Sequence, residues 1–173
     1  MTPRIPLPAD SDLPSEIRET LANLDHNFFR MLANAPASFR EVVDLAESIL
    51  MRSELPPRKR EVAVLRVAHI TGCNYEWTHH IVAAKVSGVT DDEIGKIAVT
   101  GSVDGLGEED DLLCRVADEI TGDVRLSDDA LAEILARYGV RQAMELILCC
   151  SFYNMVSRIL QSTRVELEEW VKW

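Results

Sequence analysis

The sequence predicts an all-α fold, a helical bundle in a single domain over residues 1–173. Glycine and proline are scarce, with 8 and 7 copies in 173 residues, so few positions interrupt regular structure. Apolar residues recur at helical spacing, and no stretch alternates with period two for long enough to indicate a sheet. We expect an N-terminal helical part (11–52), a core motif region (55–100) and C-terminal helices (109–165).

The N-terminal helices are delimited by prolines. Residues 11–14 are expected to open a helix over 15–24, and the apolar surface continues to Ala33 through Phe28, Phe29, Met31 and Leu32. Pro36 marks a new start, because proline is favoured in the first turn of a helix, and this second helix is expected over 37–51. Pro56 and Pro57 likewise precede a helix over 58–70.

The remaining helices have recognisable ends. Thr71-Gly72 breaks the chain before a helix over 73–87, which Gly88 follows in the usual position of a helix stop. Thr90 and Glu93 form a capping-box sequence that opens another helix. After a loop over 101–107, further helices are expected over 109–121, over 130–138 with Ser127 as the cap, and over 140–161.

The composition excludes several classes of partner. With 29 Asp and Glu against 18 Lys and Arg, the net charge of −11 is unsuited to binding nucleic acid or an anionic membrane surface. No apolar run approaches the ~18 residues of a membrane span, and residues 1–10 lack the apolar core of a signal peptide. We therefore expect a cytoplasmic location and no disulfide framework, with Cys114, Cys149 and Cys150 as core residues.

Candidate chemistry is concentrated between residues 61 and 80. If Cys73 begins its helix, steps of ~100° per residue place Glu76, Trp77 and His80 on the same face as the thiol, whereas Tyr75 and His79 point away. The start of a helix favours a thiolate, although the charge of Glu76 opposes it. His79 is accordingly interpreted as a surface or subunit-contact residue.

Glu61 reaches this face only if the chain reverses at Thr71-Gly72. In one unbroken helix it would lie ~18 Å from Cys73. An αα-hairpin would instead bring Glu61 beside His80, where a carboxylate would hold the imidazole in one tautomer and raise its basicity.

The same residues carry a family resemblance. The run from Pro56 to His80, followed by residues 83–94, resembles the carboxymuconolactone decarboxylase family, whose superfamily contains the alkyl hydroperoxidase D proteins. The sequence Cys73-Asn-Tyr-Glu-Trp77 resembles one branch of it, and residues 152–160 resemble the end of that branch. The resemblance implies an all-α fold of the alkyl hydroperoxidase D-like type with a central αα-hairpin.

One departure from the family pattern bears on activity. Peroxidase members have a Cys-x-x-Cys motif. A Glu lies twelve residues before its first Cys, and a His lies four residues after its second Cys. Here Glu61, Cys73 and His80 keep that spacing, but Glu76 replaces the second cysteine. Glu76 cannot form the disulfide that resolves the oxidised thiol, so a dithiol peroxidase is not expected.

We therefore expect a cofactor-independent lyase acting by decarboxylation or related proton transfer on a small carboxylated lactone or similar organic acid. His80 is the candidate acid/base, Glu61 its orienting partner, and Cys73 with Glu76 a proton relay or positioning pair. Candidate substrate-binding residues are Trp77, Tyr153 and His69. Two alternatives stay open: a thiol-dependent peroxidase using Cys73 without a resolving cysteine, and a non-catalytic oligomeric binding protein.

Expectations about metals and assembly complete the prediction. His69, Cys73, Glu76 and His80 are potential metal ligands, but the break at Thr71-Gly72 interrupts their helical register, so no metal is expected. The family resemblance implies no cofactor. It also implies a trimer or hexamer, in which we expect apolar faces to be buried between subunits; the residues are Phe28, Phe29, Met31, Leu32, Ile147, Leu148, Met155 and Ile159.

Overall fold

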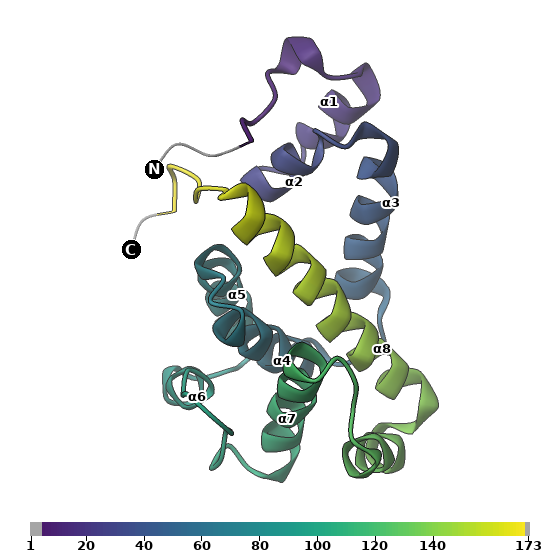
Figure 1. Ribbon diagram of the computed structural model, residues 1–173, viewed down its shortest axis with the longest axis vertical. Helices are drawn as coiled ribbons and strands as arrows, with labels where there is room; N and C mark the ends of the chain where they lie inside the picture. The colour runs from purple at the N-terminus through teal and green to yellow at the C-terminus, as the bar shows by residue number, and fades with distance from the viewer. Residues whose placement is uncertain (1–4, 172–173) are drawn as a thin grey trace.

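The structure is a computed structural model that describes residues 5–171 and is all-helical over that range. Residues 1–4 and 172–173 lie outside the described residues, so the predicted domain over 1–173 and the segment 1–10 considered for a signal peptide are described only in part. In Figure 1, α1, α2 and α3 form the upper end of the molecule, while the long helix α8 runs from the lower right through the middle to a point beside α2. The helices are η1 (Asp10–Asp12), α1 (Ser15–Leu21), α2 (Asn27–Leu32), α3 (Pro36–Glu47), η2 (Ser48–Arg52, a π-helical turn), α4 (Pro57–Ile70), α5 (Asn74–Val86), α6 (Asp91–Ile97), α7 (Glu108–Gly122) and α8 (Asp128–Thr163).

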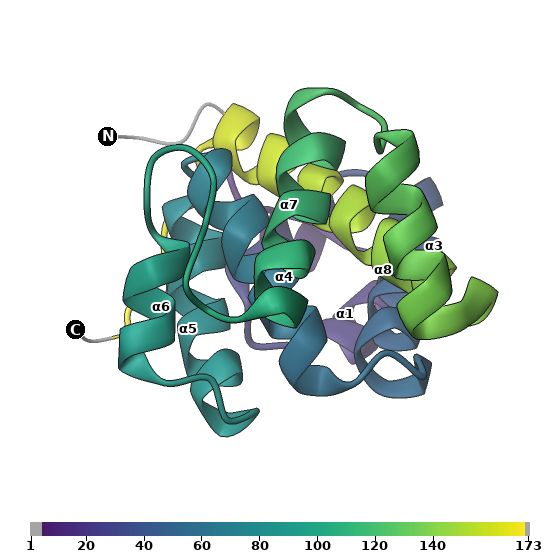
Figure 2. The same ribbon diagram turned by 90° about the horizontal axis from the view of Figure 1, so that it is seen from below.

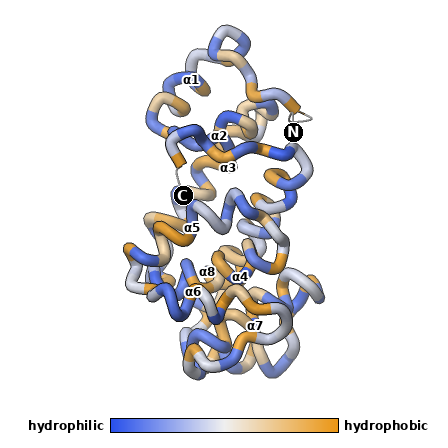
Figure 3. The backbone as a smooth tube through the Cα atoms, turned by 90° about the vertical axis from the view of Figure 1, so that its left-hand side faces the viewer, coloured by the Kyte–Doolittle hydropathy of each residue, from blue (hydrophilic) through white to orange (hydrophobic). Residues whose placement is uncertain are grey.

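Helix α4 is the centre of the main core. Every residue from Arg60 to Ala68 is buried, because α5, α7 and α8 surround this helix. Figure 2 shows α4 and α7 side by side with α5 and α6 to one side of them. The hydrophobic segments in Figure 3 gather where α4, α7 and α8 lie together. Polar groups on α4 therefore lie inside the protein, where each needs a partner.

The chain reverses between α4 and α5, as the Thr71-Gly72 break predicts. Gly72 has a φ of +64°, a backbone conformation that residues with a side chain rarely adopt. The two helices pack against each other as an αα-hairpin. Thr90 and Glu93 form the predicted capping box, and the Ser127 hydroxyl accepts a hydrogen bond from the Ala130 N–H. These local signals therefore fix the helix starts correctly.

Several predicted boundaries are wrong in detail. The expected helix over 15–24 ends at Leu21, and residues 27–32 form the separate helix α2. Phe28, Met31 and Leu32 are buried within the chain; Phe28 belongs to the main core, and Leu32 packs with residues of α1 and α3. They are therefore not available as a subunit contact.

Helix α8 contains a break and an apolar stretch. Gly139, with a φ of +69°, separates the two helices that the sequence predicts there. An 18-residue window of α8 has a mean hydropathy of 1.3, contrary to the expectation that no run reaches the length and apolar character of a membrane span. Within the protein, 56% of that window is buried, as is usual for the core helix of a bundle.

Candidate functional site

A cavity of about 360 Å³ lies between α2, the end of α3, α4, α5 and α8. Its walls are mainly apolar, which is typical of sites for small organic ligands. The polar side chains in the lining converge from α4, α5 and α8 and include most of the predicted catalytic residues. The lining consists of His26, Phe28, Phe29, Ala46, Leu50, Met51, Arg60, Glu61, Tyr75, Glu76, His79, His80, Ala83, Phe152, Tyr153, Val156 and Leu160.

Glu61 and His80 form a hydrogen-bonded pair in this cavity. The antiparallel hairpin brings Glu61 Oε2 within 2.7 Å of His80 Nδ1, the proximity that the chain reversal predicts. Arg60 Nε donates to Glu61 Oε1 at 3.1 Å, so both carboxylate oxygens are paired. Burial would raise the pKa of Glu61, but the hydrogen bond and charge of His80, with help from Arg60, hold it below its usual value.

The pairing assigns the tautomer of His80. Since ionised Glu61 only accepts hydrogen bonds, His80 Nδ1 carries a proton and Nε2 is left to act in the cavity. Among residues 5–171, no group is hydrogen-bonded to Nε2. The ring of Tyr153 meets the imidazole edge to face, with centroids 4.7 Å apart, and thereby fixes its orientation.

Glu76 occupies a contrasting environment on the next helix. It is 2% exposed, and Ser157 Oγ donates to its Oε2 at 2.6 Å. Thr71 Oγ1 lies 3.0 Å from the same serine oxygen. Burial raises the pKa of Glu76 to about 8, with only a partial offset from Ser157, so this carboxyl group is mainly protonated at neutral pH.

Cys73 does not line the cavity. It is the N-cap of α5, one residue before the helix, and it is 1% exposed beside Glu76 and Ser157. Burial raises the pKa of its thiol to about 11, and Glu76, which is ionised in the pH range where the thiol titrates, adds to this, although N–H groups at the helix start act in the opposite direction. The expectation that the helix start favours a thiolate is wrong, because loss of solvation outweighs the helix end.

The predicted ligand-binding residues divide between two places. Tyr153 lines the cavity, whereas His69 and Trp77 do not. Their rings lie 5.9 Å apart, and His69, on α4, lines a separate hollow with Arg66 and Thr100. Because Cys73 is outside the helix, its side chain is not a valid reference for the helical wheel, and the predicted face shares only Glu76 and His80 with the cavity face.

The true cavity face of α5 includes residues that sequence reasoning assigned elsewhere. Tyr75, Glu76, His79, His80 and Ala83 share it, so His79 is not simply a surface residue. The spacing of residues 76, 79, 80 and 83 is an i, i+3, i+4, i+7 pattern that could have indicated this face. Arg60, His26 and Phe152 were also missed, because their contributions depend on tertiary packing.

A C-terminal strap, defined here as residues 165–171, covers one side of the site through Glu168. This buried carboxylate accepts hydrogen bonds from the Tyr75 hydroxyl and, at 2.6 Å, from the Asn27 N–H. Its other oxygen lies 2.8 Å from His79 Nε2. Burial alone would raise the pKa of Glu168, but these donors hold it below its usual value. The strap therefore ties α2 to α5 beside the cavity.

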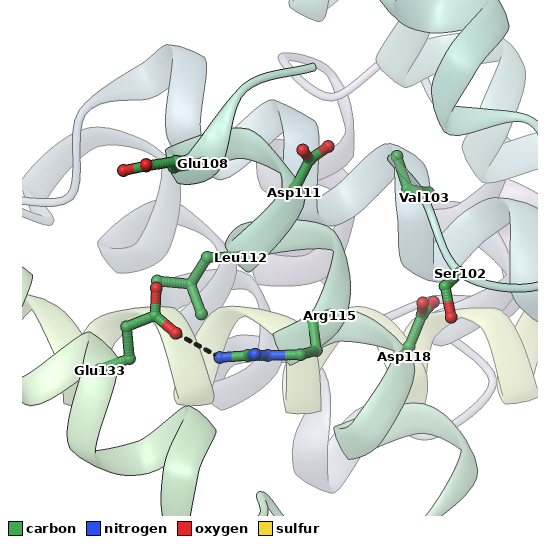
Figure 4. A pocket seen from close by; sticks show the side chains of 8 residues that line it. All are labelled: Ser102, Val103, Glu108, Asp111, Leu112, Arg115, Asp118 and Glu133. Carbon is green, nitrogen blue, oxygen red and sulfur yellow. Dashed lines mark hydrogen bonds and ion pairs between the residues drawn. The ribbon is translucent and has the colours of Figure 1, made fainter. Parts of the chain in front are cut away.

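A second hollow lies between α7 and the start of α8 (Figure 4). Its acidic side chains already have partners: Arg115 pairs with Glu133 and Arg66 pairs with Asp118, while Asp111 accepts backbone N–H groups. No group of three or more side chains placed to hold a metal ion occurs among residues 5–171, and His69 is separated from the cavity. The cavity around His80 is thus the candidate site.

The fold and the site define an all-helical protein whose central hairpin holds a Glu–His pair in an apolar cavity. Residues 36–119 match the model of the carboxymuconolactone decarboxylase family. The match covers 84 of the 173 residues and supports a relationship to the superfamily that contains the carboxymuconolactone decarboxylases and the alkyl hydroperoxidase D-like proteins. No curated protein sequence matches the chain significantly.

Solved structures share this fold over most of the chain. An uncharacterised peroxidase-related protein from Ralstonia eutropha JMP134, with an alkylhydroperoxidase AhpD core, has a TM-score of 0.81 at 17% identity, covering 98% of this chain and 94% of its own. A peroxidase-related protein from Silicibacter sp. TM1040 has a TM-score of 0.78 at 16% identity, covering 96% and 91%. A protein of unknown function from Agrobacterium tumefaciens, considered a candidate AhpD antioxidant defence protein, has a TM-score of 0.71 at 20% identity, covering 79% and 94%. The fold is the all-α fold of alkyl hydroperoxidase D-like proteins.

Proposed function

We propose that the protein is a cofactor-independent enzyme of the lyase type, which moves a proton on a small carboxylated lactone or similar organic acid. The observation that carries the proposal is the hydrogen bond between Glu61 and His80 in an apolar cavity. An imidazole oriented by a buried carboxylate is a common arrangement for general acid–base catalysis. The match of residues 36–119 to the family model supports the same class of chemistry.

The two carboxyl groups of the site are suited to different roles. The pKa of Glu61 is lowered and that of Glu76 is raised, so one is ionised and the other is neutral at the same pH. Ionised Glu61 stabilises the imidazolium form of His80, which can deliver a proton from Nε2. Neutral Glu76 leaves the cavity without an additional negative charge, which favours entry of an organic acid.

Decarboxylation in this cavity would proceed in two balanced steps. The bond between the substrate carbon and its carboxylate breaks, carbon dioxide leaves, and the electron pair moves into the conjugated lactone carbonyl. His80 Nε2–H then protonates the resulting carbanion carbon, and solvent returns the proton to the imidazole. The apolar walls favour the first step, because the carboxylate loses its charge as it leaves.

Substitution of the two members of the pair tests this proposal. Wild-type turnover is measured on a panel of small carboxylated lactones and β-keto acids, by loss of substrate and release of carbon dioxide. His80→Ala should lower kcat by ~10²–10⁴-fold, the usual contribution of proton transfer. Glu61→Gln should lower kcat with little change in KM, since an amide can hold the ring without stabilising imidazolium.

His69→Ala is the matched control, since the structure places His69 outside the cavity. It removes an imidazole from α4 and should leave turnover near the wild-type rate. Wild-type rates in His80→Ala, or equal losses in both histidine variants, would contradict the proposed site.

A thiol-dependent peroxidase is the second candidate, because two of the similar structures are described as peroxidase-related. Cys73 would reduce a hydroperoxide to an alcohol, becoming a sulfenic acid, and an external thiol would then restore it with release of water. The burial of Cys73 and its raised pKa weigh against this reaction. Hydroperoxide consumption that requires dithiothreitol and disappears in Cys73→Ser would favour it over the lyase.

A further inference from the structure

Glu76 has an oxygen without a hydrogen-bond partner in the described part of the chain. Its Oε1 is fully buried and unpaired, while Oε2 accepts from Ser157. The other carboxylate of the cavity, Glu61, has both oxygens paired. A buried polar atom without a partner costs free energy, and because the residue Glu76 lines the cavity, a ligand held there is placed to supply the missing bond.

The surroundings of Glu76 decide what kind of partner fits. Ser157 donates to Oε2, so the proton of the neutral carboxyl group resides on Oε1. No ion pair joins Glu76 to a cationic side chain among residues 5–171, and the nearby Arg60 is bonded to Glu61 and to the Leu50 carbonyl. An ionised carboxylate here would be buried without a counter-charge, which is strongly unfavourable. Oε1 is therefore a hydrogen-bond donor and its partner is an acceptor.

We propose that the protonated Glu76 binds the carbonyl oxygen of the substrate, and that the site selects lactones or similar carbonyl compounds for this reason. The inference rests on the proposed function and adds the group that recognises the substrate. Glu76 and His80 lie one turn apart on the same face of α5, about 6 Å along the helix axis at 1.5 Å per residue. A small conjugated ring spans such a distance, with its carbonyl at Glu76 and its reacting carbon towards His80.

This placement also connects recognition with chemistry. The electron pair released in decarboxylation accumulates on the lactone carbonyl oxygen. A donor already positioned on that oxygen stabilises the developing charge, as in an oxyanion hole. Tyr153, whose hydroxyl has no hydrogen bond to any of residues 5–171, lies against the same histidine and lines the cavity from α8.

Binding of a matched pair of unreactive probes tests the proposal without turnover. Coumarin is a conjugated lactone without a carboxylate to lose, and 2H-chromene has the same ring system without the carbonyl. Affinities of both are measured by ligand-observed NMR on the full chain at pH 6.5. The wild type should bind coumarin about 10-fold more tightly than 2H-chromene, the effect of one hydrogen bond to an otherwise unpaired buried donor.

Two substitutions separate recognition from a structural role. Glu76→Leu should bind both probes equally, because it lacks the donor but keeps an apolar side chain of similar size. Glu76→Gln should keep most of the preference for coumarin, since its amide oxygen can accept from Ser157 while its N–H donates to the ligand. The preserved preference in Glu76→Gln also verifies that the cavity is intact in a variant at this position.

His80→Ala distinguishes this inference from the proposed function. It should lose turnover yet keep the preference for coumarin, because the recognition group is untouched. A Glu76-dependent preference in a protein that turns over no carboxylated lactone would overturn the lyase proposal alone. Equal wild-type binding of the two probes, binding of neither, or an unchanged preference in Glu76→Leu would overturn the assignment of Glu76.

Discussion

Glu61 and Glu76 have identical side chains, both nearly inaccessible to solvent, and yet their pKa values move in opposite directions. Glu61 has an arginine and a histidine as partners, whereas Glu76 has a single hydroxyl group. The difference arises from charge compensation, because burial disfavours ionisation of both groups. At the scale of single residues, the partners of each carboxyl group therefore determine its protonation and its chemistry.

The raised pKa of Glu76 has a consequence for stability. Because the folded protein holds this proton up to about pH 8, while an unfolded chain releases it near pH 4.5, stability should fall as pH rises between these values. Glu76→Gln should remove that dependence, which amounts to about 1.4 kcal/mol for each unit of pKa shift. Urea unfolding of both proteins at pH 5, 6.5 and 8 measures it. Parallel pH profiles would contradict a neutral buried Glu76.

The raised pKa of Cys73 predicts low reactivity. A shift from 9 to about 11 lowers the thiolate fraction at neutral pH by about 100-fold, and burial further restricts access. Iodoacetamide at pH 7.5 should therefore alkylate Cys73 in the folded protein at least 100-fold more slowly than in the urea-unfolded chain. Mass spectrometry of the Cys73 peptide over time provides both rates. Rapid labelling of the native protein would make the peroxidase the stronger candidate.

At the scale of elements, the C-terminal strap is held by one side chain. Glu168→Ala would leave the Tyr75 hydroxyl, the Asn27 N–H and the His79 ring without their acceptor. We expect a loss of about 1–3 kcal/mol in the free energy of unfolding, the usual cost of removing the partner of a buried donor. Hydrogen exchange should also become faster over residues 26–29 and 165–171.

Glu169→Ala is the matched control for the strap, since it removes an exposed carboxylate from the neighbouring position. It should change neither the free energy of unfolding nor the exchange rates of these segments. Similar effects of the two substitutions would show that Glu168 does not hold the strap in place.

The helices show which parts of the site can be predicted from sequence. Proline, glycine and capping residues act locally, so the hairpin and hence the meeting of Glu61 with His80 follow from the break at Thr71-Gly72. The orientation of α5 does not follow from such signals. It depends on how α4 and α8 pack against it, and a wheel that starts at Cys73 misplaces Trp77 and His79. The position of the strap depends on contacts between residues more than 85 positions apart in the sequence, such as that of His79 with Glu168.

At the scale of the whole molecule, apolar side chains remain on the surface after both hydrophobic clusters have formed. Val140, Met144 and Leu148 form a stripe of exposed residues at four-residue spacing along α8. Leu148 belongs to the surface that the sequence predicts as a subunit contact, whereas Phe28, Met31 and Leu32 are buried within one chain. We therefore propose that subunits contact one another through this stripe on α8.

Light scattering at micromolar concentration should return three or six times the 19.4 kDa mass of one chain. Met144→Asp, in the middle of the stripe, should lower that mass because a charge would be buried between subunits. Val124→Asp, at an exposed position in the turn before α8, is the control and should leave it unchanged. A 19.4 kDa particle for the wild type would refute the assembly.

The reversal at Gly72 also has a consequence for the order of events during folding. Glu61 and His80 are only 19 residues apart, so their pairing closes a short loop and can form within the hairpin itself. Tyr153 and Ser157 belong to a helix synthesised much later, and the pocket has no enclosing wall until that helix docks. A ribosome-bound chain that ends near residue 125 would therefore already contain the Glu61–His80 pair, but with its apolar surroundings exposed to water. If the hairpin folds early, its apolar surface stays exposed to solvent and prone to aggregation until α8 docks on it.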